Sequence, residues 1–135
     1  MNKMFLRGLK AIAAVTGTVV VTNCGGPNDA ANITSTNFLP ADVSPGVATV
    51  FTVNYDLGTP ITGGTATYSY SLNGIPFSPT ISDLCSQTEC PKLVGPQTEV
   101  SKSTFPDVTG KIVSKIQWTD QDNRNVWCTQ LNFRV

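Results

Sequence analysis

Residues 47–55, Val-Ala-Thr-Val-Phe-Thr-Val-Asn-Tyr, decide the fold class of this chain. In an extended strand, successive side chains point to opposite faces, so every second residue shares a face. One face of this segment would carry Val47, Thr49, Phe51, Val53 and Tyr55. The other face would carry smaller or polar side chains, among them Ala48, Thr52 and Asn54. A strand with one apolar and one polar face is typical of an antiparallel sheet that packs on one side only.

The same two-residue period occurs in three later segments, residues 65–72, 111–118 and 130–135. Pairs typical of turns lie between such segments, as at Gly63-Gly64 and Asn73-Gly74. No segment has a convincing helical period. We therefore predict an all-β chain of six to eight strands, folded as an immunoglobulin-like two-sheet antiparallel β-sandwich. The length of 135 residues is enough for one such domain.

Residues 73–96 break this pattern. They carry four prolines and two cysteines among scattered apolar residues. Because proline cannot donate a hydrogen bond to a neighbouring strand, this density excludes a central strand. We predict a loop or edge element that packs over the mouth of the sandwich.

The N-terminal residues predict export. Three basic residues precede an uncharged, mostly apolar run over residues 11–22, which is the pattern of a secretory signal peptide. We predict a signal peptide over residues 1–22 and a domain over residues 23–135, with Gly17 as a second candidate for the cleavage point. The alternative interpretation is that residues 18–22 form a first strand. The expected location is outside the cell, or in the lumen of a lysosome or endosome.

Four cysteines follow this segment, namely Cys24, Cys85, Cys90 and Cys128. Only a Ser-Gln-Thr-Glu turn separates Cys85 from Cys90, so we expect these two to form a disulfide. The remaining pair, Cys24–Cys128, joins the start of the domain to its end. A zinc site is disfavoured because the chain has no CxxC motif and no histidine. A lipidated Cys24 is disfavoured because Asn23 fits that motif poorly and Cys128 would lose its partner.

The composition excludes several classes of function. Lys+Arg and Asp+Glu balance at 9 each, and 13 % of the residues are charged, so we expect no nucleic-acid partner. The absence of histidine removes the commonest general base and the commonest zinc ligand. Asp120 and Asp122 are spaced like paired carboxylates, but we interpret them as part of a hairpin turn. We predict no enzymatic activity, no metal and no cofactor.

Two further features concern the surface and the interior. Asn32 begins an Asn-Ile-Thr sequon and is a candidate glycosylation site on a eukaryotic secretory route. The inward aromatic residues of the predicted strands have two interpretations. They either fill a closed core, as in an interaction module that binds through its outer surface, or they line a slot for a hydrocarbon chain between splayed sheets.

Short motifs follow one another along the chain: Asn23-Cys24-Gly25, Ile61-Thr62-Gly63-Gly64, Gly74-Ile75-Pro76-Phe77, Asp83-Leu84-Cys85, Cys90-Pro91, Phe105-Pro106, Ile116-Gln117-Trp118, Asp120-Gln121-Asp122 and the final strand through Cys128. In order and spacing they resemble the ML (lipid-recognition) domain family. That family includes sterol carriers of the Niemann–Pick type C group and phosphatidylglycerol/phosphatidylinositol transfer proteins. The resemblance covers essentially the whole chain after the predicted signal peptide.

The resemblance implies a lipid slot between the two sheets, and it agrees with the disulfide pairing expected above. By the same resemblance, Phe77, Val108 and Trp118 correspond to residues that line the slot in the sterol carriers, and Phe105 is a near neighbour of these positions. The complete set of candidate lipid-binding residues is Phe51, Tyr68, Tyr70, Phe77, Phe105, Val108, Ile116 and Trp118. The expected partner of this monomeric protein is a lipid, either a phospholipid or a sterol, with transient membrane contact.

Two departures from the sterol carriers favour a phospholipid. The chain has no cysteines near residues 40–45, where those carriers have a third disulfide, and its segment from Gly74 to Cys85 is shorter.

Overall fold

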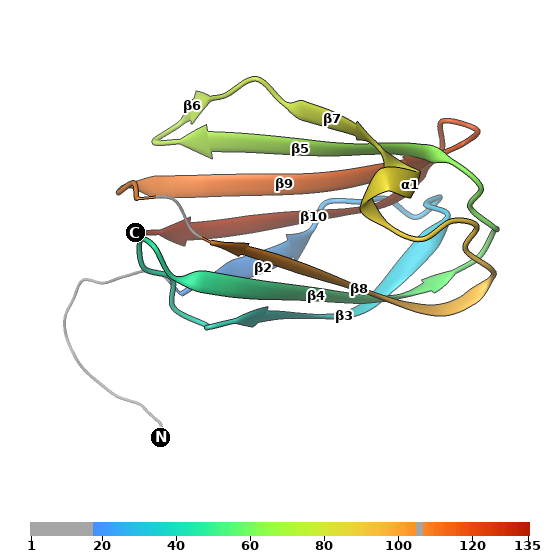
Figure 1. Cartoon of the computed structure of the whole chain (residues 1–135), viewed down its shortest axis with the longest axis horizontal. Coiled ribbons are helices and arrows are strands. Elements are labelled where there is room, and N and C mark those ends of the chain that lie inside the picture. Colours follow the sequence, from blue (N-terminus) through green and yellow to red (C-terminus); the bar gives the residue numbers. More distant parts are fainter. Residues whose placement is uncertain (1–17, 105–106) are drawn as a thin grey trace.

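The computed structural model describes residues 18–104 and 107–135, and these residues form two antiparallel sheets that face each other (Figure 1). The larger sheet has the order β2-β10-β9-β5-β6, and β7 also pairs with β5. Its strands are β2 (Val20–Asn23), β5 (Gly64–Leu72), β6 (Ile75–Pro76), β7 (Thr80–Asp83), β9 (Lys111–Asp120) and β10 (Asn125–Arg134). The smaller sheet has the order β3-β4-β8, with strands β3 (Ala31–Leu39), β4 (Ala48–Leu57) and β8 (Gly95–Thr104).

The predicted two-sheet antiparallel β-sandwich is confirmed. The described residues contain nine strands rather than six to eight, because the short strands β2 and β6 add to the segments with clear alternation. The only helix in the described part of the chain is α1 (Leu84–Gln87). No helix among these residues has the length and apolar character needed to span a membrane.

The alternation in the sequence matches the burial of the strands. On β4, Phe51, Val53 and Tyr55 are buried, and the residues between them are only partly buried. The inward residues of the larger sheet lie in rows across the strands, because the register pairs Ala66 with Trp118 and Trp118 with Trp127. These rows and the inward face of β4 form one hydrophobic core between the sheets.

The first part of the proline-rich residues 73–96 forms an edge of the larger sheet, which agrees with the predicted edge element, whereas residues 95–96 begin β8 of the smaller sheet. β6 and β7 both pair with β5 and lie outside it, and α1 follows β7 directly (Figure 1). Leu84 of α1 is fully buried and anchors the helix to the core. The Cys85–Cys90 disulfide closes the short loop that follows, which confirms this predicted pairing.

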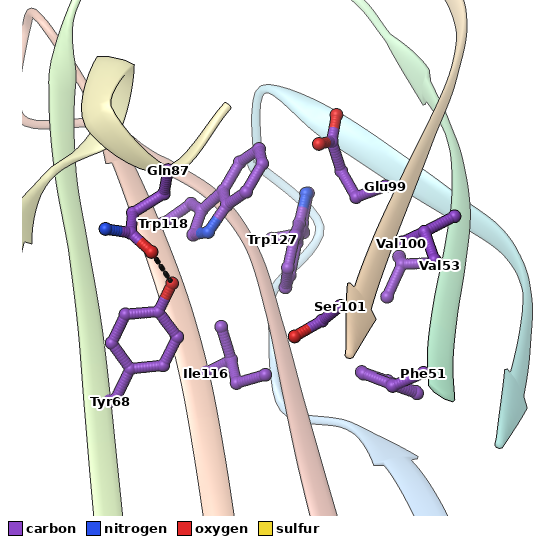
Figure 2. Close-up of a pocket in the computed structure, with 10 residues that line it drawn as sticks. All are labelled: Phe51, Val53, Tyr68, Gln87, Glu99, Val100, Ser101, Ile116, Trp118 and Trp127. Carbon is purple, nitrogen blue, oxygen red and sulfur yellow. Dashed lines mark hydrogen bonds between the residues drawn. The ribbon is translucent and has the colours of Figure 1, made fainter. Parts of the chain in front are cut away.

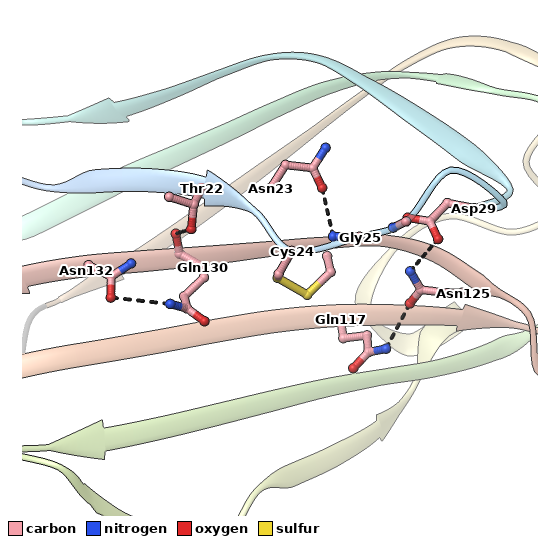
Figure 3. Close-up of a disulfide and its surroundings, with 11 residues drawn as sticks. Thr22, Asn23, Cys24, Gly25, Asp29, Gln117, Asn125, Gln130 and Asn132 are labelled. Atoms are coloured by element: carbon pink, nitrogen blue, oxygen red, sulfur yellow. Dashed lines mark hydrogen bonds between the residues drawn. A yellow bond between two sulfur atoms is a disulfide. The ribbon is translucent and has the colours of Figure 1, made fainter.

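The second predicted disulfide, Cys24–Cys128, links the residue after β2 to the middle of β10. A line of side-chain hydrogen bonds runs beside it, in which Asn125 donates to Asp29 and Gln117 donates to Asn125 (Figure 3). The disulfide and these bonds fasten the start of the domain to its last strand.

Strand β2 contains residues 20–22, which were predicted to be the end of the signal peptide. It pairs with residues 129–132 of β10, and Thr18 forms an isolated bridge with Asp42. The position of β2 corresponds to the alternative interpretation, in which residues 18–22 form a first strand. Residues 1–17 lie outside the described residues.

The β9–β10 connection is the hairpin turn expected at Asp120 and Asp122. The Asp120 carboxylate accepts hydrogen bonds from the backbone N–H groups of Asp122 and Arg124, so it serves the turn. Gly64, opposite Asp120, has φ +141°, and a Cβ there would clash with the Thr119 carbonyl oxygen. Only glycine fits this position without moving the backbone.

Candidate functional site: a pocket between the sheets

The interior of the sandwich is unevenly apolar, because strand β8 carries polar residues where its neighbour carries apolar ones. The register of β4 with β8 pairs Phe51 with Ser101 and Val53 with Glu99. Tyr55 pairs with a polar residue in the same way. β8 is an edge strand, and Ser101 is exposed although its partner Phe51 is buried. The apolar core therefore stops short of β8 and leaves space beside it.

A pocket of about 90 Å³ occupies this space, and it is called the inter-sheet pocket here. Its walls come from β4 and β8 on one side and from β5, β9, β10 and α1 on the other (Figure 2). The lining residues are Phe51, Val53, Tyr68, Gln87, Glu99, Val100, Ser101, Ile116, Trp118 and Trp127.

Aromatic rings form the floor of the inter-sheet pocket. The rings of Trp118 and Trp127, on neighbouring strands, lie with their centroids 4.6 Å apart at an angle of 32°. Tyr55 approaches Trp118 edge-on from the opposite sheet, with centroids 6.3 Å apart. Tilted and edge-on arrangements are favourable for aromatic pairs. Trp118 and Trp127 line the pocket, and Tyr55 packs against them; all three are buried, so the floor is largely aromatic.

A partly buried ion pair lies at one end of the pocket. Lys92 Nζ is 2.8 Å from Glu99 Oε2, and the two side chains are 10 % and 18 % exposed. The Tyr55 hydroxyl donates to Glu99 Oε2 at 2.9 Å, and the Thr88 hydroxyl donates to Glu99 Oε1 at 2.8 Å. Burial, followed by the charge of Glu99 and its hydrogen bond, raises the pKa of Tyr55 far above its ordinary range. The Tyr55 hydroxyl therefore keeps its proton and remains a donor.

The opposite wall carries a polar contact between β5 and α1. The Tyr68 hydroxyl donates to Gln87 Oε1 at 3.1 Å (Figure 2). Burial raises the pKa of Tyr68, so this hydroxyl also stays protonated. The contact ties α1 to the aromatic wall beside the solvent-exposed side chain of Gln87.

A second hollow lies at the β6 edge of the larger sheet and is called the edge groove here. It has a volume of about 310 Å³. The rings of Tyr70 and Phe77 meet in it with centroids 5.3 Å apart. Burial raises the pKa of Tyr70. Phe77 is 51 % exposed, so the groove presents an aromatic surface to solvent.

The candidate lipid-binding residues fall into four groups. Phe51, Tyr68, Ile116 and Trp118 line the inter-sheet pocket, whereas Tyr70 and Phe77 line the edge groove. Val108 is partly buried and packs against the core without lining either hollow. Phe105 lies outside the described residues. Asn32, the candidate glycosylation site, is exposed on β3.

Sequence reasoning missed six lining residues of the inter-sheet pocket: Val53, Gln87, Glu99, Val100, Ser101 and Trp127. Val53 could have been predicted from the sequence, because it shares the inward face of residues 47–55 with Phe51. Trp127 could also have been predicted, because it has the same odd-numbered spacing as the apolar residues Leu131 and Phe133 of the last strand. The β8 residues gave no signal, because an inward face made of polar side chains has no apolar alternation to detect.

The arrangement defines a class of protein: a disulfide-linked antiparallel sandwich with a partly open, aromatic-lined pocket between its sheets. The family model of the ML domain matches residues 18–135. The chain belongs to the ML-domain family. No curated protein sequence matches it.

Two solved structures resemble the fold. One is a Niemann-Pick type C2 protein from Japanese carpenter ant, with a TM-score of 0.66 and 11 % identity, covering 84 % of this chain and 96 % of that one. The other is chicken MD-1 complexed with lipid IVa, with a TM-score of 0.64 and 16 % identity, covering 91 % of this chain and 93 % of that one. At these identities the likeness concerns the fold.

Proposed function

We propose that this protein binds a lipid between its two sheets and carries it in a secreted or lysosomal compartment, without enzymatic activity and without a cofactor. The observation that carries the proposal is the inter-sheet pocket, whose floor is formed by Trp118 and Trp127 and which opens beside β8. A partly open pocket that combines an aromatic floor with several placed polar groups is typical of ligand sites. Membership of the ML-domain family adds support, as does the lipid IVa complex of chicken MD-1.

The pocket must widen to hold a whole lipid. Its volume of about 90 Å³ is well below the roughly 300–1,000 Å³ of pockets that enclose a drug-sized ligand. β8 is hydrogen-bonded to β4 alone among the described strands, so it is the wall that moves most easily. In the proposed complex the tail occupies the aromatic floor, and the polar head stays at the rim beside Ser101.

The proposed carrier contacts membranes transiently through the edge of the larger sheet. Ile75, Phe77 and Ile81 lie on or beside β6 and β7 and are between 51 % and 68 % exposed. These side chains supply an apolar surface next to the edge groove, and no cluster of positive charge is needed for contact through them. The lipid would be a phospholipid or a sterol, and the carrier would act as a monomer.

Export is supported by the two disulfides, because such bonds persist in oxidising compartments. We propose that the signal peptide is cleaved after Gly17 rather than after residue 22. The reason is that β2 needs residues 20–22 to pair with β10, and the family match begins at residue 18. Edman sequencing of the secreted protein would test this, with Thr18 as the expected first residue. Expression in eukaryotic cells would show by a mass shift whether the exposed Asn32 carries a glycan.

A secreted interaction module without lipid is the second candidate function. The observation that favours it is the small volume of the inter-sheet pocket, because an interior this well filled resembles an ordinary core. The exposed edge of the larger sheet would then be the surface that contacts a protein partner.

Uptake from vesicles separates the two functions. The secreted protein would be incubated with phosphatidylcholine vesicles that contain a trace of radiolabelled phosphatidylcholine or cholesterol, and then separated from them by gel filtration. A carrier elutes with label that approaches one lipid per protein and delivers it to fresh acceptor vesicles. If neither label elutes with the protein, the interaction module is the better account.

A further inference from the structure

Glu99 is the only charged residue among the described residues that line the inter-sheet pocket. Its cation, Lys92, approaches Glu99 Oε2 but does not line the pocket. Among the lining residues, Glu99 is therefore the source of charge, and Lys92 reaches its carboxylate from outside the lining. Glu99 is on β8, the strand that bounds the opening.

The Glu99 carboxylate is held in place by its partners but can accept one more hydrogen bond. Oε2 accepts from Tyr55 and pairs with Lys92, while Oε1 accepts from Thr88 alone among its recorded partners. A carboxylate oxygen has two lone-pair sites, so Oε1 has room for one more donor. Such a hydrogen bond to a charged acceptor is stronger than one between neutral groups.

The other polar groups on the wall are neutral, and they include the indole N–H of Trp127, which has no recorded acceptor. Gln87 already accepts from Tyr68 through Oε1, and its Nε2 lies 3.4 Å from the Ser86 hydroxyl. Ser101 contributes a neutral hydroxyl. Lys92 balances part of the Glu99 charge, but it lies outside the lining. An anionic head group that approached from the pocket would therefore bring a second negative charge to the side of Glu99 away from its cation, in a partly desolvated site where like charges repel.

We propose that Glu99 selects lipid alcohols, whose uncharged hydroxyl donates to the carboxylate, and rejects lipids whose head group at this position is a carboxylate or a phosphate. The inference rests on the proposed lipid-carrier function and deepens it. It separates the lipid classes that the sequence left open, because a sterol or a fatty alcohol satisfies Glu99 and an anionic phospholipid does not.

The test compares two probes with the same chain length, 1-hexadecanol and palmitate, at pH 7.4 and below their aggregation limits. Quenching of tryptophan fluorescence reports binding, since both tryptophans of the chain line the pocket. We expect hexadecanol to bind the unchanged protein about tenfold or more tightly than palmitate. In Glu99→Gln the preference should fall by about tenfold or reverse, because Lys92 is left as the nearest charge.

Glu89→Gln is the matched control, since it makes the same change in charge at an exposed residue of the loop that precedes β8. It should keep the preference of the unchanged protein. A second variant, Glu99→Gln with Lys92→Met, removes both charges and covers the case in which an unpaired Lys92 prevents folding. This double variant should bind the two probes with similar affinity.

The outcomes separate the inference from the function on which it rests. Equal binding of hexadecanol and palmitate by the unchanged protein overturns the role of Glu99 and leaves the lipid carrier intact. The same conclusion follows if Glu99→Gln keeps the preference, or if neither probe binds while labelled phospholipid or cholesterol is taken up from vesicles. Failure to bind any of these lipids overturns the proposed function itself.

Discussion

Filling the inter-sheet pocket should make the protein more stable and less able to bind lipid. Val53 is 2 % exposed and lies on the wall of the pocket. In Val53→Phe, a phenyl ring replaces two methyl groups and extends into the empty volume. A cavity of about 90 Å³ costs about 2 kcal/mol at roughly 24 cal/mol per Å³. Because the pocket is partly open to solvent, about 2 kcal/mol is the upper limit of the gain in the free energy of unfolding.

Two assays on Val53→Phe test this trade-off. Urea unfolding followed by circular dichroism measures the change in the free energy of unfolding, and vesicle uptake measures lipid binding. We expect a stability equal to or above that of the unchanged protein, with lipid uptake reduced about tenfold or more. Thr52→Phe is the control, because Thr52 is the adjacent residue on the opposite face of β4. It should leave uptake unchanged.

The reasoning fails if Val53→Phe takes up lipid as well as the unchanged protein does, because the tail would then lie elsewhere. It also fails if the substitution destabilises the protein by the roughly 1–3 kcal/mol that is typical of overpacking. In that case the space beside Val53 is already filled, and the small pocket is part of an ordinary core.

The two disulfides and the tyrosines give further predictions. Replacing the Cys24–Cys128 disulfide, which spans 104 residues, with alanines should cost about 4.7 kcal/mol of unfolding free energy in the chain-entropy model. The same change at Cys85–Cys90, which spans 5 residues, should cost only about 2 kcal/mol, and an equal loss in urea unfolding would contradict that model here. Burial raises the pKa of all three tyrosines. The stability that they contribute is therefore complete below pH 10.0, the pKa of an unfolded tyrosine. It is lost as the pH rises through the pKa values of the folded protein. Absorbance at 295 nm should therefore show Tyr55 ionising only together with alkaline unfolding, and ionisation in the folded protein would refute its burial.

The strands were predictable where one face is apolar and the other polar. The alternation at residues 47–55 identified β4, and the short spacing of Cys85 and Cys90 led to both disulfides. The sandwich follows from these local patterns, because each half-apolar strand must bury one face against a second sheet. Strand β2 was less visible, because its residues also resemble the apolar segment of a signal peptide.

The site was predictable only in its apolar half. Trp118 and Ile116 lie in an alternating segment and were found, whereas Glu99 and Ser101 belong to a strand with polar residues on both faces. Their position depends on the pairing of β8 with β4, which is a contact between residues about fifty positions apart in the chain. Phe77 was carried over from the family resemblance to the slot, but the structure has it in the edge groove beside Tyr70.

The most direct test of the central claim is the lipid content of the protein itself. The protein would be expressed as the full chain in an oxidising secretory compartment, purified without detergent and extracted with organic solvent, and the extract analysed by mass spectrometry. The account predicts one lipid per protein molecule, with a neutral hydroxyl as its polar group. An extract without stoichiometric lipid, from a protein that also takes up neither added sterol nor added phospholipid, would contradict it.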